Sequence, residues 1–166
     1  MKKLPISYLD LELCLEDHTR DINQYYLDTE TGEVITIDQS LYSQWEDGEE
    51  IEKEDLPPWQ QDQFDSMMAV FNDVNEQRLK MVPEFDAIDE ADTMRLFVRK
   101  VENRAITNEL FDALDGPKSF RRFRAMLNRH PAVRSQYDQF QEQEYQVFLE
   151  NWLQEIGIEP EWSDNA

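Results

Sequence analysis

The side chains with the clearest chemical potential are the basic residues of one segment, 116–135, which contains six Lys or Arg and no Asp or Glu. The rest of the chain is acidic. The full sequence of 166 residues holds 16 Lys or Arg against 37 Asp or Glu, a net charge of −21. Guanidinium groups form charge-assisted, often bidentate hydrogen bonds with carboxylates and phosphates. A basic segment in so acidic a chain therefore either pairs with the protein's own carboxylates or contacts a partner.

Helical projection divides these basic side chains into two groups. At 100° per residue, Phe120, Phe123 and Leu127 span about 60° and form a stripe that faces a core. Two arginines flank the stripe, and we expect them to reach carboxylates of neighbouring helices. Two others lie nearly opposite it and are the better candidates for a partner contact. The flanking pair is Arg121 and Arg124, the opposite pair is Arg122 and Arg129, and Lys118 is the fifth candidate partner-binding residue.

Residues that could support nucleophilic catalysis or zinc binding are sparse. His18 and His130 have no motif neighbour, and four glycines are too few for a phosphate-binding loop. Zinc would need Cys or His ligands close together in the sequence, and no Cys and His residues have such spacing. Cys14, the single cysteine, lies among leucines, which predicts a buried structural thiol. We therefore expect no catalytic residues of these classes and no cofactor.

Carboxylates allow one further enzymatic idea, a hard-cation site formed by Asp28, Glu30 and Glu33. Gly32, however, stands where a calcium loop requires an oxygen-bearing side chain, and turn carboxylates are usually only solvated. A metal-dependent carboxylate enzyme therefore ranks third among the functions considered.

The net charge bears on the class of partner. Affinity for nucleic acid depends largely on neutralising phosphates, which a charge of −21 opposes, as it opposes docking on an anionic membrane. Acidity favours basic protein partners. With one cysteine, no long apolar run and no signal peptide, the sequence predicts a soluble cytoplasmic protein.

The N-terminal part has the patterns of strands. Leucines at alternate positions over residues 9–15 predict a half-buried strand, although a short helix is also compatible with Leu and Glu. Residues 25–28 and 33–37 flank a turn with Gly32, which predicts a β-hairpin. An acidic connector follows over residues 43–60.

Helical periodicity begins after Pro57 and Pro58, which cannot continue a ladder or a helix interior. Four helical regions are expected. They are one from about 61 to Lys80, a long one carrying Met94 to Leu114 and closed by Gly116, one capped by Ser119 and ending before Pro131, and one from about Val133 to Ile156 ended by Gly157.

The fold class expected is α+β: a small N-terminal antiparallel sheet followed by a bundle of about four helices, mainly α. A single domain over residues 1–160 is expected for a chain of this length, rather than two independent domains. It would comprise a strand-rich part (1–42), the acidic connector and a helical part (61–158). The tail, 159–166, is expected to fray, and Trp162 either pins it to the domain or acts as a recognition element.

Several segments resemble a known family, the uncharacterised protein family 0158 of small acidic bacterial proteins. The resemblance covers about residues 8 to 160, with Pro117 after Gly116 as a departure. It implies a bacterial cytoplasmic protein and supplies no catalytic residues. The matching segments are Tyr26-Leu27-Asp28, Thr31-Gly32-Glu33-Val34, Ala113-Leu114-Asp115-Gly116, Phe120-Arg121-Arg122-Phe123, Trp152-Leu153 and Gly157-Ile158.

The leading functional hypothesis is a non-enzymatic interaction or regulatory module, which recognises a protein partner through the Arg-bearing helix or the acidic surface. The alternative is a nucleic-acid-associated protein whose basic helix, within residues 116–135, meets phosphates despite the global charge.

Overall fold

The computed structural model describes residues 1–164 and divides into two compact units. The mixed unit contains residues 1–84 and the C-terminal residues from 150, and the helical unit contains residues 85–149. Helices and small sheets both occur, which confirms the α+β class. The described residues form seven α-helices where about four were expected, because two further helices lie before residue 47 and one expected helical region is divided into two helices. The single domain over 1–160 stays a prediction.

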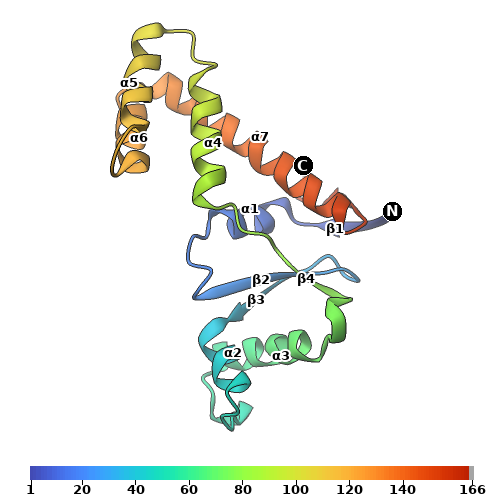
Figure 1. The fold of residues 1–166 in the computed structure, drawn as a ribbon. Coiled ribbons are helices and arrows are strands. Elements are labelled where there is room, and N and C mark those ends of the chain that lie inside the picture. The colour runs from blue at the N-terminus through green and yellow to red at the C-terminus, as the bar shows by residue number, and fades with distance from the viewer. Residues whose placement is uncertain (165–166) are drawn as a thin grey trace. The chain divides into compact units, whose positions relative to one another are not determined.

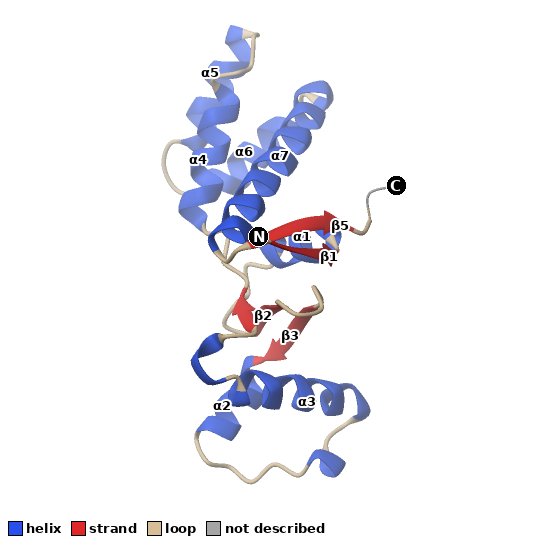
Figure 2. Cartoon of the chain, turned by 90° about the vertical axis from the view of Figure 1, so that its right-hand side faces the viewer, coloured by secondary structure: helices blue, strands red, loops and turns tan. Residues whose placement is uncertain are grey.

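The mixed unit contains two small sheets. In one, β1 and β5 pair in parallel and bring the first and last described strands side by side (Figure 2). The other is antiparallel, with β2 between β3 and β4, and α2 and α3 lie beside it (Figure 1). The elements are β1 (Lys2–Ile6), α1 (Tyr8–Glu16), β2 (Asn23–Asp28), β3 (Val34–Asp38), α2 (Gln39–Glu46), α3 (Pro58–Asn72), β4 (Leu79–Met81) and β5 (Ile158–Trp162).

The strand predicted over residues 9–15 is wrong, because this segment lies in α1. Ser7 caps the helix, and its hydroxyl oxygen accepts a hydrogen bond from the backbone N–H of Asp10 at 3.2 Å. The buried face has helical spacing, while the intervening leucines 9 and 13 are exposed. Alternating Leu and Glu is compatible with the repeat of a strand and with that of a helix, and the N-cap at Ser7 favours the helix. The buried residues of α1 are Leu11, Cys14 and Leu15.

The predicted hairpin is confirmed as β2 and β3. Its turn needs glycine, since Gly32 has a φ of +82° and donates its N–H to the carbonyl of Asp28 at 2.7 Å. A β-carbon at Gly32 would lie 2.1 Å from the carbonyl oxygen of Pro5. The turn therefore fits closely against β1.

The acidic connector is only partly irregular, because α2 occupies its first residues. Asp38 caps α2 by accepting from the backbone N–H groups of Ser40 and Leu41. The change of architecture at Pro57 is confirmed, since α3 begins at Pro58. This helix ends at Asn72 rather than near Lys80. Asp73 accepts from the backbone N–H groups of Arg78 and Leu79, where β4 begins, and Asn75 has a φ of +65°.

The helical unit contains α4, α5, α6 and the part of α7 up to residue 149 (Figure 1). The long helical region predicted up to Leu114 is two helices, because Asn103 caps α5 by accepting from two backbone N–H groups. Gly116 follows α5 with a φ of +88°, as its C-cap role requires. Ser119 is not the cap of α6 but its first residue. The helices are α4 (Ala87–Val98), α5 (Arg104–Leu114), α6 (Ser119–Asn128) and α7 (Pro131–Glu155).

The core of the helical unit is aromatic and aliphatic. The ring of Tyr137 packs edge to face against Phe97 and Phe123, with centroids 5.2 and 5.3 Å away. The core stripe expected for α6 is confirmed, with Phe123 and Leu127 buried and Phe120 packed beside them. The buried members are Met94, Phe97, Val98, Leu110, Phe123, Leu127 and Tyr137.

The C-terminal tail is not frayed over the described residues. Gly157 ends α7 as predicted, and the chain then forms β5. Trp162 packs edge to face on Tyr8 at 5.3 Å, which confirms that this side chain pins the tail. Asp164 accepts hydrogen bonds from the backbone N–H groups of Tyr8 and Leu9. Periodicity missed β5 because its partner, β1, stands at the other end of the sequence.

No helix within residues 1–164 is both long and apolar enough to cross a membrane.

Candidate functional site

The basic candidate residues all stand on α6 or directly beside it. The apolar stripe of Phe123 and Leu127 is fully buried and fixes which face of α6 is exposed. Lys118 takes a left-handed backbone conformation, with a φ of +57°, in the turn before the helix. Arg129 is the residue at the C-terminal end. The sequence therefore placed these side chains on one short amphipathic helix correctly.

Arg122 is exposed, as predicted, but its guanidinium is bonded to carbonyl groups of the protein itself. Its Nη1 donates to the carbonyl oxygen of Asp115 at 2.5 Å, and its Nη2 donates to that of Asp112 at 3.1 Å. The carbonyl of Asp112 belongs to the last turn of α5 and that of Asp115 directly follows the helix, where helical N–H partners are no longer present. Arg122 therefore caps α5 and joins it to α6. A helical projection cannot predict this role, because it describes one helix alone and carries no information on where the end of α5 lies.

The remaining four basic side chains are exposed and have no ion pair with any carboxylate among residues 1–164. The carboxylate clasp expected for the flanking pair is thus not formed. One nearby carboxylate is already used, since Glu109 lies 3.0 Å from the His130 ring nitrogen. Exposed cations without carboxylate partners in the chain can accept external anions. We call these four the α6 basic surface; they are Lys118, Arg121, Arg124 and Arg129.

Charge is distributed unequally between the two units. The helical unit contains ten Lys or Arg against eleven Asp or Glu, a net charge of −1. The remaining residues contain six against 26, a net charge of −20. Nearly all of the acidity of the chain therefore belongs to the mixed unit, and the α6 basic surface belongs to an almost neutral one.

Two cavities flank α6 within the helical unit. The cavity toward α5 has a volume of about 320 Å³, and its wall includes Arg122, Met126 and Arg129. The cavity toward α7 has a volume of about 300 Å³. Both are large enough for a small group, and each carries arginine on its wall. The wall of the α6–α7 cavity is formed by Arg124, Leu127 and Asn128 from α6 and by Arg134, Tyr137, Asp138 and Gln141 from α7.

Tyr137, one of the residues of the α6–α7 cavity wall, has a buried hydroxyl that the sequence analysis missed. Tyr137 is 4% exposed, and its hydroxyl has no hydrogen-bond partner among the described residues. Burial raises the pKa of this phenol, so the hydroxyl stays protonated at neutral pH. Gln141 and Tyr145 both donate to buried Glu90, at 3.3 and 3.0 Å. Glu90 could have been noticed, because it occupies the apolar face of α4 four residues before Met94.

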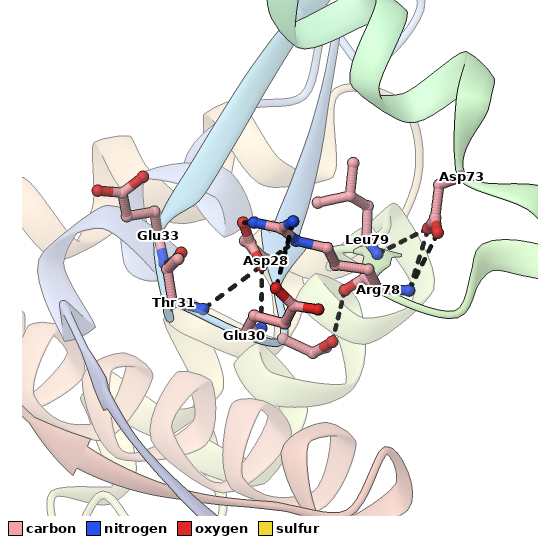
Figure 3. A network of polar contacts seen from close by, with 8 residues as sticks. Asp28, Glu30, Thr31, Glu33, Asp73, Arg78 and Leu79 are labelled. Atoms are coloured by element: carbon pink, nitrogen blue, oxygen red, sulfur yellow. Dashed lines mark hydrogen bonds and ion pairs between the residues drawn. The ribbon is translucent and has the colours of Figure 1, made fainter.

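The hairpin carboxylates bind an arginine rather than forming an open ligand set. Arg78 donates to the two oxygens of Asp28 from Nε and Nη2, at 3.0 and 2.8 Å (Figure 3). Its Nη1 lies 3.2 Å from Glu30. Glu33 points away from this arginine (Figure 3). The bidentate pair lowers the pKa of Asp28 to about 2. Among residues 1–164 no three His, Cys, Asp or Glu side chains are grouped to hold a metal ion.

The single cysteine is inert in its environment. Cys14 is 2% exposed, and its Sγ contacts the carbonyl oxygen of Asp10 at 3.1 Å. Burial raises the pKa of the thiol to about 12, so little thiolate forms near neutral pH. The expected structural thiol is confirmed.

Comparison with known proteins identifies one family. No curated protein and no solved structure matches the chain. The sequence model of the Uncharacterised protein family (UPF0158) matches residues 9–165. This match includes the hairpin, the Gly116 turn and all of α6. The chain therefore belongs to the Uncharacterised protein family (UPF0158).

Proposed function

We propose that the protein is a non-enzymatic binding module whose α6 basic surface recognises an acidic segment of a partner protein. The observation that carries this proposal is the absence of internal carboxylate partners for Lys118, Arg121, Arg124 and Arg129 among residues 1–164, in a chain with 37 Asp or Glu. If these side chains served to neutralise the protein's own acidic residues, each of them would pair with a carboxylate of the chain. An external anionic group accounts for side chains that are left exposed and unpaired.

Charge segregation favours a short acidic segment over a long polyanion. The helical unit is almost neutral, so a segment confined to α6 is attracted locally. A nucleic acid extends far beyond one short helix, and its phosphates meet repulsion from the net charge of −21. Salt screens interactions between exposed charges beyond roughly 8 Å at physiological ionic strength, so local charge governs the binding of a small ligand.

Rigid placement of α6 supports the same proposal. Phe123 and Leu127 anchor the helix in the core, and Arg122 ties it to α5. The basic side chains thus project from a fixed backbone, which lowers the entropy lost on binding. A frayed basic tail would have no such advantage.

The test is an anisotropy titration of the full chain with a short fluorescent peptide rich in Asp and Glu. The variant Arg121→Glu/Arg129→Glu reverses two charges of the surface, and Arg99→Glu/Arg104→Glu makes the same change on exposed residues of the helical unit outside α6. We expect about tenfold or greater weakening only in the first variant. Equal affinity of both variants would refute the proposal.

Nucleic acids are tested in the same experiment as the alternative class of ligand. Single- and double-stranded DNA and RNA are titrated at about 50 mM salt, where phosphate binding is strong. We expect weaker binding than for the acidic peptide. Tighter binding that is lost in Arg121→Glu/Arg129→Glu would replace the proposed protein partner by a nucleic acid.

A further inference from the structure

We infer that the outer edge of β3, together with the cavity beside it, binds an extended, basic segment of a partner protein as an added strand. This binding site lies wholly within the mixed unit and shares no residue with the α6 basic surface. It does not depend on the function proposed for α6.

The outer edge of β3 has backbone groups that the sheet does not use. β3 is an edge strand, and among residues 1–164 it pairs only with β2. Asp28 of β2 donates its backbone N–H to the carbonyl of Glu33 at 2.8 Å. Because antiparallel strands bond through every second residue, the backbone groups of Val34 and Thr36 point away from β2. These two residues are only half-buried, so a further strand can reach their N–H and C=O groups.

The other edge strands of the described residues have features that hinder the addition of a strand. β1 and β5 contain Pro5 and Pro160, which have no backbone N–H to donate. β4 has only three residues, with Lys80 at its centre. Prolines, lysines and short strands are common protection for the edges of sheets. β3 has none of these features and begins with four β-branched residues, which favour strand pairing.

A cavity of about 320 Å³ lies between α1 and the hairpin. α1 is on the side of the sheet opposite α2 and α3 (Figure 1). Residues that stand opposite each other on neighbouring strands have their side chains on the same face. An added strand would therefore direct every second side chain toward the cavity, where Leu13 is 62% exposed and offers apolar contact. The wall is formed by Asp10, Leu13 and Cys14 from α1 and by Tyr25, Val34 and Thr36 from the hairpin.

The charge around the cavity favours a basic strand. Residues 7–40 contain nine Asp or Glu against one Lys or Arg, a net charge of −8. That one cation, Arg20, is buried and donates to three backbone carbonyl groups. Arg78, which pairs with Asp28, offsets one of the negative charges. Asp10 is part of the cavity wall, so a Lys or Arg of the added strand is attracted to it.

A second copy of the chain does not fit this edge. Pairing of two β3 strands would bring together two mixed units, each with a net charge of −20. Like charges at close range repel each other. The acidity of the mixed unit therefore opposes self-pairing at an edge that has neither proline nor lysine, and the same acidity attracts a basic strand.

The experiment is an anisotropy titration of the full chain with a short fluorescent peptide in which Val and Thr alternate between terminal lysines. The matched control is the same peptide with methyl groups on its backbone nitrogens, which keeps the side chains and the charge but prevents strand pairing. We expect saturable binding of the unmethylated peptide and about tenfold or greater weakening on methylation. No binding up to about 1 mM, or equal affinity of the two peptides, overturns the inference.

Variants assign the binding to the β3 edge. Thr36→Pro removes an outward N–H that the sheet does not use, and Thr36→Val keeps it. Leu13→Ala removes the exposed apolar side chain from the cavity wall, and Leu9→Ala makes the same change outside the wall, at a leucine that is 58% exposed. We expect about threefold or greater weakening in Thr36→Pro and Leu13→Ala, with the affinity retained in the other two.

The comparison of Leu13→Ala with Leu9→Ala decides if Thr36→Pro does not fold, as circular dichroism would show. Equal affinities of these two leucine variants would then overturn the inference. Thr36→Pro that folds and binds the lysine peptide as well as Thr36→Val does would overturn it as well.

The two proposals can fail separately. Arg121→Glu/Arg129→Glu should lose the acidic peptide and retain the lysine peptide, whereas Leu13→Ala should show the opposite behaviour. Analytical ultracentrifugation tests the remaining occupant. Self-association of the wild-type chain that is lost in Leu13→Ala would mean that a second copy occupies the edge, and would overturn the assignment to a basic partner.

Discussion

Arg122 and Asp115 are joined by a hydrogen bond of 2.5 Å, from the guanidinium Nη1 to the backbone carbonyl that follows α5. A second bond, to the carbonyl of Asp112, makes the guanidinium a bracket across the turn. This bracket determines where α6 begins to run and hence where the α6 basic surface lies. One arginine of the basic segment thus has a structural role, in contrast to the neighbours that we propose to bind a partner.

Removal of this bracket should destabilise the protein. Arg122→Ala deletes two charge-assisted bonds to terminal carbonyls, and we expect a loss of about 1 kcal/mol in the free energy of unfolding. Arg121→Ala, one residue away without such bonds, should change it by less than about 0.5 kcal/mol. Urea denaturation followed by circular dichroism measures both. Equal effects would show that Arg122 is not a cap.

Asp28 should contribute stability that depends on pH. Its pKa falls from an ordinary 3.8 to about 2, first because Arg78 donates to it. At neutral pH this shift corresponds to at most about 2 kcal/mol, since Arg78 itself is half exposed. Asp28→Asn should lose that amount. Asp65→Asn, which removes an exposed partner of Lys53, should lose less than about 0.5 kcal/mol.

The sign follows from the depressed pKa. The contribution of Asp28 is complete above its unfolded value of about 4 and is lost as the pH falls through about 2. The difference between wild type and Asp28→Asn should therefore be constant from about pH 5 to 7 and shrink between about pH 4 and 2. Denaturation curves across this range decide. A difference that grows toward acid pH would contradict the assignment.

Gly32 should be the least replaceable glycine. Gly32→Ala combines left-handed strain with a β-carbon only 2.1 Å from the Pro5 carbonyl oxygen, for an expected loss of about 3 kcal/mol. Gly48→Ala has a similar φ, +86°, but no atom within 4 Å, and should lose only about 1 kcal/mol. Thermal unfolding compares the two. Similar losses would mean that the hairpin turn does not rest against β1.

Sequence patterns predicted the elements whose causes are local. The hairpin followed from residues flanking Gly32, and the core stripe of α6 followed from the spacing of Phe120, Phe123 and Leu127. The parallel pairing of β1 with β5 has no local signal, because its strands stand at opposite ends of the chain. α1 was mistaken for a strand because alternating leucines satisfy both periods, and only Ser7 distinguishes them.

The location of the candidate site could be predicted from the sequence, but the different roles of its individual residues could not. Charge alone singled out residues 116–135, and amphipathic spacing made them a helix. The cap formed by Arg122 depends on where α5 ends in space, and the cavity depends on how α7 crosses α6. Tyr137 drew attention only as a core residue, since its unpartnered hydroxyl is a property of the packed structure.

The central claim is that the α6 basic surface binds an acidic protein segment. Nuclear magnetic resonance of the full, isotope-labelled chain during titration with the Asp- and Glu-rich peptide tests it most directly. We predict chemical-shift changes concentrated at Lys118, Arg121, Arg124 and Arg129 that saturate and that disappear in Arg121→Glu/Arg129→Glu. Shifts confined to the mixed unit, or none anywhere, would contradict the claim.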